Sequence, residues 1–283
     1  MLNGDLKKNA LNQLEHAHAI YVKNVEIVTK DSERLFVLRQ KSSQNVIGSV
    51  AQYINQLSNS PKEFDRSFST YKAEFQIFNS MIRQLEIEAA AVELKAGTSA
   101  VSGVAAGIGV AVMAPTAAMA IATTFGVAST GTAISALSGA AATNAALAWL
   151  GGGALAAGGS GMAGGSAFLA LAGPVGWTIC GTVLIGSALF ARHQNQKIAE
   201  EANAKRKIIE VHNAAMKAAE YEITRLIDAT NQHINGVNNL LHQLSRSAPK
   251  DYKRFSSAQK ESLGALINHL QSLSALLNKK IPA

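Results

Sequence analysis

The sequence predicts an all-α protein, an elongated helical bundle with coiled-coil-like arms around a central hydrophobic helical region rich in glycine and alanine. Apolar residues recur at helical spacing in both flanks, and neither flank alternates polar and apolar residues as a half-buried strand does. Residues 96–191 contain no Asp, Glu, Lys, Arg or His. Since about 20 apolar residues span a bilayer, this centre is long enough for several crossings. We predict three domains, at residues 1–96, 97–191 and 192–283.

The N-terminal arm, 1–96, is expected to hold two helices with a break near 58–61. The first has an apolar residue every three or four positions, the spacing of a coiled-coil seam. Ser60, Pro61 and Glu63 resemble a capping box, in which serine caps the helix and glutamate reaches back. The bundle seam of the second helix steps by four and three through Phe64, Phe68, Tyr71, Phe75, Phe78, Ile82 and Leu85.

The C-terminal arm, 192–283, is expected to hold two more helices with a break near 247–256. A helical pattern begins at Gly173 and Pro174, inside the centre, and runs to about Leu244 before Pro249 ends it. Residues 256–259 are expected to cap a last helix. Its predicted apolar face consists of Leu263, Leu266, Ile267, Leu270, Leu273 and Leu277.

The centre, 97–191, divides at glycines and prolines into candidate helices at about 99–113, 116–127, 132–150, 162–172 and 175–191. Small residues recur every fourth position, as in a glycine zipper, where helix backbones approach closely within lipid. Trp177 and Arg192 are expected to anchor the last segment at the interface. The residues assigned to membrane insertion and helix packing are Gly103, Gly107, Ala111, Gly131, Ser135, Gly139, Gly161, Gly165, Trp149, Trp177 and Arg192.

The composition of the centre argues against permanent residence in a membrane. Leu, Ile and Phe favour insertion by a few tenths of a kcal/mol each, and the centre is mostly Ala, Gly, Ser and Thr. A weakly apolar region is expected to shelter in a helical bundle or oligomer and to emerge later. This pattern indicates a protein with a soluble state and an inserted state.

Charge is distributed unevenly along the chain. Of the formal net charge of +7, about +1 lies before residue 97 (12 Lys/Arg against 11 Asp/Glu) and about +6 lies from residue 192 onward (14 against 8). A basic arm suits an anionic lipid surface. It would also suit nucleic acid, but no nucleic-acid motif and no interleaved aromatic residues accompany it, so no nucleic-acid partner is expected.

No catalytic, cofactor or metal site is expected. The G-x-G-x-x-G match at 159–164 has no preceding strand and no acidic residue about 20 positions further on. His16 and His18 are two positions apart and face different sides of a helix. Cys180 is the single cysteine, so no internal disulfide forms. No conventional signal peptide opens the chain, which is expected to be cytoplasmic or to be released by another route.

The order of long helix, capped helix, uncharged segment, long return helix and final helix resembles the α-helical pore-forming toxins. These include cytolysin A and components of haemolysin BL and of the non-haemolytic enterotoxin. The resemblance implies a bacterial pore-forming protein that oligomerises, alone or with related helical proteins, as a hydrophobic part inserts into the membrane. Two alternatives stay open: a non-toxic membrane-anchored scaffold or remodelling factor that binds a partner through its arms, and a constitutive multi-span transmembrane protein. The centre also has a faint resemblance to the membrane-inserting part of apolipoprotein L proteins.

Overall fold

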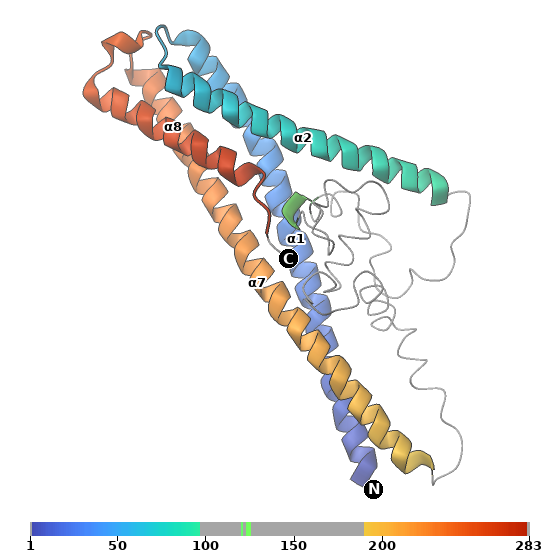
Figure 1. The fold of residues 1–283 in the computed structure, drawn as a ribbon. Helices are drawn as coiled ribbons and strands as arrows, with labels where there is room; N and C mark the ends of the chain where they lie inside the picture. Colours follow the sequence, from blue (N-terminus) through green and yellow to red (C-terminus); the bar gives the residue numbers. More distant parts are fainter. Residues whose placement is uncertain (1, 97–119, 121–122, 126–189, 282–283) are drawn as a thin grey trace.

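A computed structural model of the chain describes residues 2–96, 120, 123–125 and 190–281. The named elements are α1 (Leu2–Gln56), α2 (Lys62–Ala96), α7 (Phe190–Ser247), the short 3-10 helix η3 (Tyr252–Arg254) and α8 (Ser257–Leu277). Throughout these ranges the elements are helical and no strand is found, which confirms the all-α class. The four long helices, α1, α2, α7 and α8, together form the helical frame (Figure 1).

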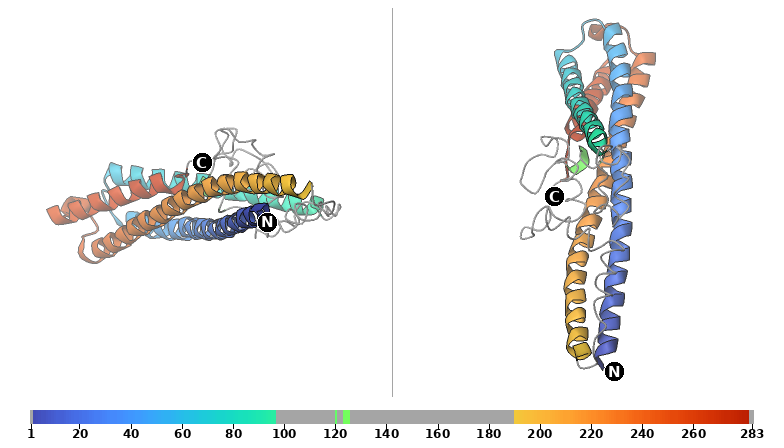
Figure 2. Two further views of the ribbon diagram at one scale, coloured as in Figure 1. Left: turned by 90° about the horizontal axis from the view of Figure 1, so that it is seen from below. Right: turned by 90° about the vertical axis from the view of Figure 1, so that its right-hand side faces the viewer.

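Helices α1 and α7 lie side by side over most of their length and run in the same direction (Figures 1 and 2). Two contacts fix their direction, because Asn24 bonds Asn213 near one end and Ser58 pairs with Asp251 near the other. Helices α2 and α8 turn back along the frame and pack against each other, while α8 also packs against α7. Together the four helices enclose the largest apolar core cluster, which includes Val50, Phe78, Val237 and Leu270.

Buried positions along α1 follow the three-and-four spacing expected from the sequence. Ala10, Leu14, Ala17 and Tyr21 begin the series, which continues to Leu57. The matching face of α7 buries Ile209, Met216, Ile223, Ile227 and Leu241. Since side chains three and four positions apart share one helix face, each helix turns a single continuous stripe toward the frame interior.

The two turns of the frame contact each other. The N–H of Ser58 donates to the carbonyl of Lys250 at 2.7 Å, and the N–H of Tyr252 donates to the carbonyl of Ser58 at 3.0 Å. Asn59 has a φ of 55°, in the left-handed region that asparagine tolerates better than most residues. Its side chain donates to the Asp251 carboxylate at 2.9 Å. This turn therefore joins the α1–α2 connection to the α7–α8 connection.

One predicted cap forms and the other differs. At the start of α8, Ser256 accepts from the N–H of Gln259, whose side chain accepts from the N–H of Ser256, which is the expected capping box. The box predicted at Ser60 was wrong. Helix α2 starts at Lys62, the Pro61 carbonyl accepts its first hydrogen bonds, and the Ser60 hydroxyl donates to the Asp65 carboxylate at 2.8 Å. Pro61 is therefore the N-cap residue, whereas the sequence pattern placed the N-cap one residue earlier, at Ser60.

Candidate functional site

The candidate site is the place where the uncharged centre meets the helical frame. Ala120 and residues 123–125, which are helical and lie within the expected helix 116–127, have at most 1% of their surface exposed. The Phe125 ring enters a core cluster that includes Val28 and Leu35 of α1 and Met216 and Ile223 of α7. Full burial of a phenylalanine side chain is worth about 1.5–3 kcal/mol. This ring is therefore a substantial apolar anchor for the centre.

The residues that follow α8 bind the same stretch of the centre. The Lys280 ammonium donates to the Thr123 carbonyl at 2.6 Å, and the Ile281 N–H donates to the Thr124 carbonyl at 2.9 Å. The Ile281 side chain is 5% exposed and belongs to the same cluster as Phe125. Two backbone carbonyls and one aromatic ring of the centre are thus held by a short C-terminal tail.

Helices α1 and α2 hold this tail in place. From α1, the Arg39 guanidinium donates through Nη2 to the carbonyls of Leu276 and Lys279, at 2.8 and 2.9 Å. Carbonyls in the last turn of a helix carry partial negative charge, which a cation stabilises. From α2, the Glu74 carbonyl and carboxylate accept from the Asn278 amide at 3.0 and 2.7 Å. The tail is therefore bonded on one side to the frame and on the other side to the centre.

A buried cation, Arg39, and a half-buried cation, Lys280, lie at this junction. Arg39 has 1% of its surface exposed, and burial lowers the pKa of its guanidinium to about 10, so it remains charged at neutral pH. Burial, followed by repulsion from Arg39, lowers the pKa of Lys280 to about 8. Neither cation forms an ion pair with a carboxylate of the described chain. Burying unpaired charge is costly, so the junction contains a destabilising element within an otherwise well-bonded contact.

Polar side chains also interrupt the apolar stripe between α1 and α7. The amide of Asn24 donates to that of Asn213 at 3.0 Å, and Asn213 donates to the Ala17 carbonyl at 3.1 Å, all in the interior. The hydrogen bonds of a buried asparagine pair form only when the two helices are in one register, just as a single buried asparagine specifies the register of a coiled coil. Further along α1, the buried hydroxyl of Ser43 accepts from Tyr71 of α2 at 2.8 Å.

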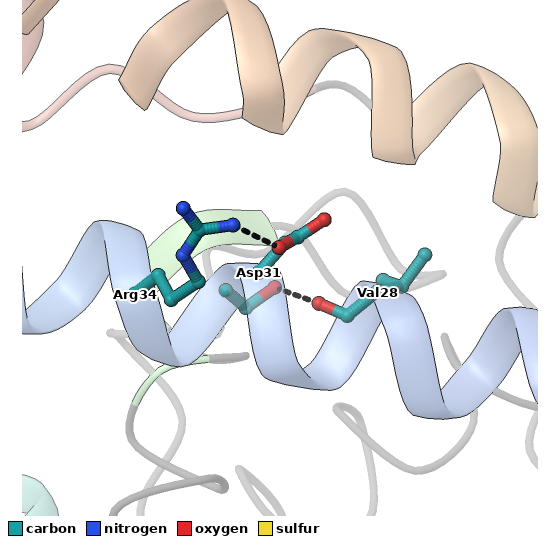
Figure 3. Close-up of polar contacts among 4 residues, drawn as sticks. Val28, Asp31 and Arg34 are labelled. Atoms are coloured by element: carbon teal, nitrogen blue, oxygen red, sulfur yellow. Dashed lines mark hydrogen bonds and ion pairs between the residues drawn. The ribbon is translucent and has the colours of Figure 1, made fainter. Parts of the chain in front are cut away.

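Local contacts on α1 serve structure and not chemistry. The buried hydroxyl of Ser32 donates to the Val28 carbonyl one turn earlier, at 2.7 Å. Figure 3 shows this bond to Val28 beside the ion pair of Asp31 and Arg34, whose atoms lie 3.1 Å apart. The arginine side chain is largely exposed. Exposed ion pairs contribute at most about 1 kcal/mol, so this pair is a minor contributor to the helix.

Five of the predicted bundle-seam residues lie in the core, namely Phe64, Tyr71, Phe75, Phe78 and Ile82, and Phe68 packs partly buried against it. The side chain of Leu85 lies outside the described set. Ten of the residues assigned to membrane insertion and helix packing also lie outside the described residues: Gly103, Gly107, Ala111, Gly131, Ser135, Gly139, Gly161, Gly165, Trp149 and Trp177. Arg192 is in the first turn of α7, but its side chain is outside the described set.

Sequence reasoning missed the residues that form the junction. Arg39 and Lys280 look like surface cations in the sequence, and Asn24 and Asn213 look like exposed helix residues. One signal was available, because Asn24, Ser32, Arg39 and Ser43 fill positions that continue the apolar spacing of α1. Polar residues at seam positions indicate buried hydrogen bonding, although not the partner.

Within the described ranges no three His, Cys, Asp or Glu side chains come together in a way that would hold a metal ion. The described helices also include none that is long and apolar enough to cross a bilayer. No family model, no curated protein and no solved structure matches this chain. The resemblance to helical pore-forming toxins therefore stays a prediction.

Proposed function

We propose that this protein inserts into membranes and forms pores, converting from a soluble helical bundle with coiled-coil-like arms into an oligomeric, membrane-embedded state. The observation that carries this proposal is the stretch 96–191, without a single ionisable residue, between two charged arms. In water the apolar side chains of such a stretch need to be buried against other parts of the protein. The burial of Ala120 and Phe125 among frame residues supports a sheltered soluble state.

The composition of the centre favours a small free-energy difference between the two states. Glycine, alanine and serine have small side chains, so they gain little free energy from burial in a folded protein and little from transfer into lipid. Once in lipid, the stripes through Gly103 and Gly107 and through Gly131 and Gly139 allow close backbone contact between helices. Assembly would then supply stability that a single copy lacks, which favours oligomers of this chain or of related helical proteins.

The ends of the centre are attached to different helices. Helix α2 ends at Ala96 and α7 begins at Phe190, and the two ends lie apart in the frame (Figure 1). The arm that begins with α7 carries about +6 of the formal charge, which favours its approach to anionic lipid. We infer that the C-terminal arm faces the membrane first and that the centre follows.

Dye release from vesicles containing anionic lipid tests the proposal. Protein purified without detergent is expected to be monodisperse and then to release the dye at micromolar concentration. Both tryptophans of the chain, Trp149 and Trp177, lie in the centre, so intrinsic fluorescence reports its position independently. Quenching by brominated lipid chains, together with leakage, is the expected result.

Three other outcomes assign the protein to other classes. Tight vesicle binding with tryptophan quenching but without leakage would favour the membrane-anchored scaffold. A requirement for detergent at every stage would favour the constitutive multi-span protein. Sealed vesicles together with unquenched tryptophans would contradict membrane insertion altogether.

The small-residue stripes are tested by Gly107→Leu and Gly139→Leu, which are expected to impair oligomer assembly and leakage together. Gly48→Leu is the matched control, because Gly48 is an exposed helix position with open space around its Cα. The control is expected to leave both properties unchanged. Unaltered oligomer size in the first two variants would reject the interface role of these stripes.

A further inference from the structure

We propose that residues 278–281, here called the C-terminal latch, hold the uncharged centre against the helical frame. The latch must release the centre before the centre can move away from the frame. The biological meaning of this inference rests on the proposed membrane function. The latch itself is a property of the protein in water and is tested there.

The latch has a fixed side and a detachable side. On the fixed side, Arg39 binds the Leu276 and Lys279 carbonyls, and Glu74 binds Asn278 twice. These contacts join the latch to α1 and α2. The detachable side consists of two hydrogen bonds, from Lys280 to Thr123 and from Ile281 to Thr124, next to the shared burial of Phe125 and Ile281. Opening on the detachable side leaves the fixed side intact.

The detachable side contains features that weaken it. Lys280 is held near Arg39, and no described carboxylate pairs with either cation. The Lys280 ammonium lies 3.6 Å from the Met81 sulfur of α2, and Glu74 of the same helix accepts from Asn278. The hydroxyl of Thr124 is buried without a hydrogen-bond partner among the described residues. An unsatisfied buried polar group lowers the stability of a contact.

The contact therefore combines a strong apolar anchor with unfavourable polar burial. Phe125 and Ile281 hold the centre in place, whereas the charge on Lys280 and the Thr124 hydroxyl both gain hydration when the contact opens. Because apolar burial and polar desolvation oppose each other, the contact is closed in water and only a modest change in its free energy of opening is needed to release it, as a switch requires.

Limited chymotrypsin digestion without lipid tests the latch, because Phe125 is a cleavage site that is fully buried while the latch is closed. Ile281→Asp places a carboxylate in the apolar cluster and is expected to raise the rate of cleavage after Phe125 at least tenfold. Ala275→Asp places the same carboxylate at an exposed α8 position outside the latch, so it is the matched control and is expected to leave that rate unchanged. Cleavage after Phe78, in the four-helix core, monitors the integrity of the frame.

Equal cleavage rates after Phe125 in the unaltered chain and in Ile281→Asp would overturn the latch. If Ile281→Asp also exposes Phe78, the milder Ile281→Ala decides, and it must accelerate cleavage at Phe125 alone by several fold or the latch is rejected. Vesicle leakage by the same variants separates the two proposals. Faster cleavage at Phe125 with no leakage by any variant retains the latch and rejects the pore.

Discussion

Replacing Lys280 by methionine tests the electrostatics of the latch. Burial and Arg39 lower the pKa of Lys280 from 10.5 to about 8. The folded protein therefore releases this proton more readily than the unfolded chain, which binds more protons between pH 8 and pH 10.5. The free energy of unfolding consequently rises with pH across that window and is insensitive to Lys280 below it.

The magnitude follows from the size of the shift. Lowering the pKa of Lys280 from 10.5 to about 8 corresponds to roughly 3.5 kcal/mol at most, since a tenfold change in proton affinity is worth about 1.4 kcal/mol. Between pH 7.5 and pH 9.5 the unaltered chain should gain about 2 kcal/mol in free energy of unfolding from this residue. Methionine also loses the hydrogen bond to Thr123, at a cost of about 1–3 kcal/mol. The absolute stability of Lys280→Met near neutral pH is therefore less informative than its pH dependence.

Chemical unfolding at several pH values, followed by circular dichroism, measures this difference. Lys280→Met is expected to lack the gain of about 2 kcal/mol between pH 7.5 and pH 9.5 that the unaltered chain shows. Lys279→Met is the control and should retain it, because it removes a neighbouring exposed lysine. If Lys280→Met and the unaltered chain have parallel pH profiles, the ammonium is not buried as described and the electrostatic reasoning fails.

Three further predictions concern the frame. Asn213→Leu leaves the amide of Asn24 unsatisfied and removes the bond to the Ala17 carbonyl, so unfolding by urea should show a loss of about 1–3 kcal/mol, and an unchanged midpoint would contradict the buried pair. Gly236→Ala forces a Cβ into the ring of His269 and should destabilise, whereas Gly264→Ala has open space and should stabilise by about 0.5–1 kcal/mol; equal effects in thermal unfolding would refute this packing. Burial, and then the charge of His269, lowers the pKa of His233. The free energy of unfolding should therefore fall as the pH drops below about 6.5, and in acid unfolding it should fall less for His233→Gln than for the unaltered chain.

Helix positions were the most predictable part of the fold. Apolar spacing and turn residues placed the first break beside Ser58, and α1 ends at Gln56. All six predicted apolar positions of the last helix, including Leu263 and Leu277, are buried in α8. These features depend on residues close in the sequence, where the 3.6-residue repeat and local capping dominate.

The junction was unpredictable because its contacts join distant parts of the chain. Arg39 and Leu276 are 237 positions apart, and Lys280 and Thr123 are 157 apart. Local pattern reports which face of a helix is buried but not which residue will lie opposite. A buried arginine and a half-buried lysine are also exceptions to the usual exposure of cations, so composition gives no reason to place either at an interior junction.

Ser60 illustrates a failure at short range. The serine, proline and glutamate pattern matched a capping box, but the Pro61 carbonyl accepts the first hydrogen bonds of α2, so the helix starts one residue later than the pattern requires. At Ser256 the helix begins where the pattern places it, and the predicted reciprocal bonds with Gln259 form.

The arrangement of core clusters explains how the centre could leave without unfolding the frame. The four-helix core is built almost wholly from the arms and includes Ala120 as its one buried residue from the described part of the centre. The middle cluster loses Phe125 when the centre departs but retains Val28, Leu35 and Met216 from the two long helices. The Asn24–Asn213 pair lies near a third core cluster, which includes Tyr21 of α1 and Ile209 of α7 and contains no described residue of the centre. Because the register and most of the main core come from the arms, we expect the proposed conversion to break the described junction contacts and to leave the frame folded.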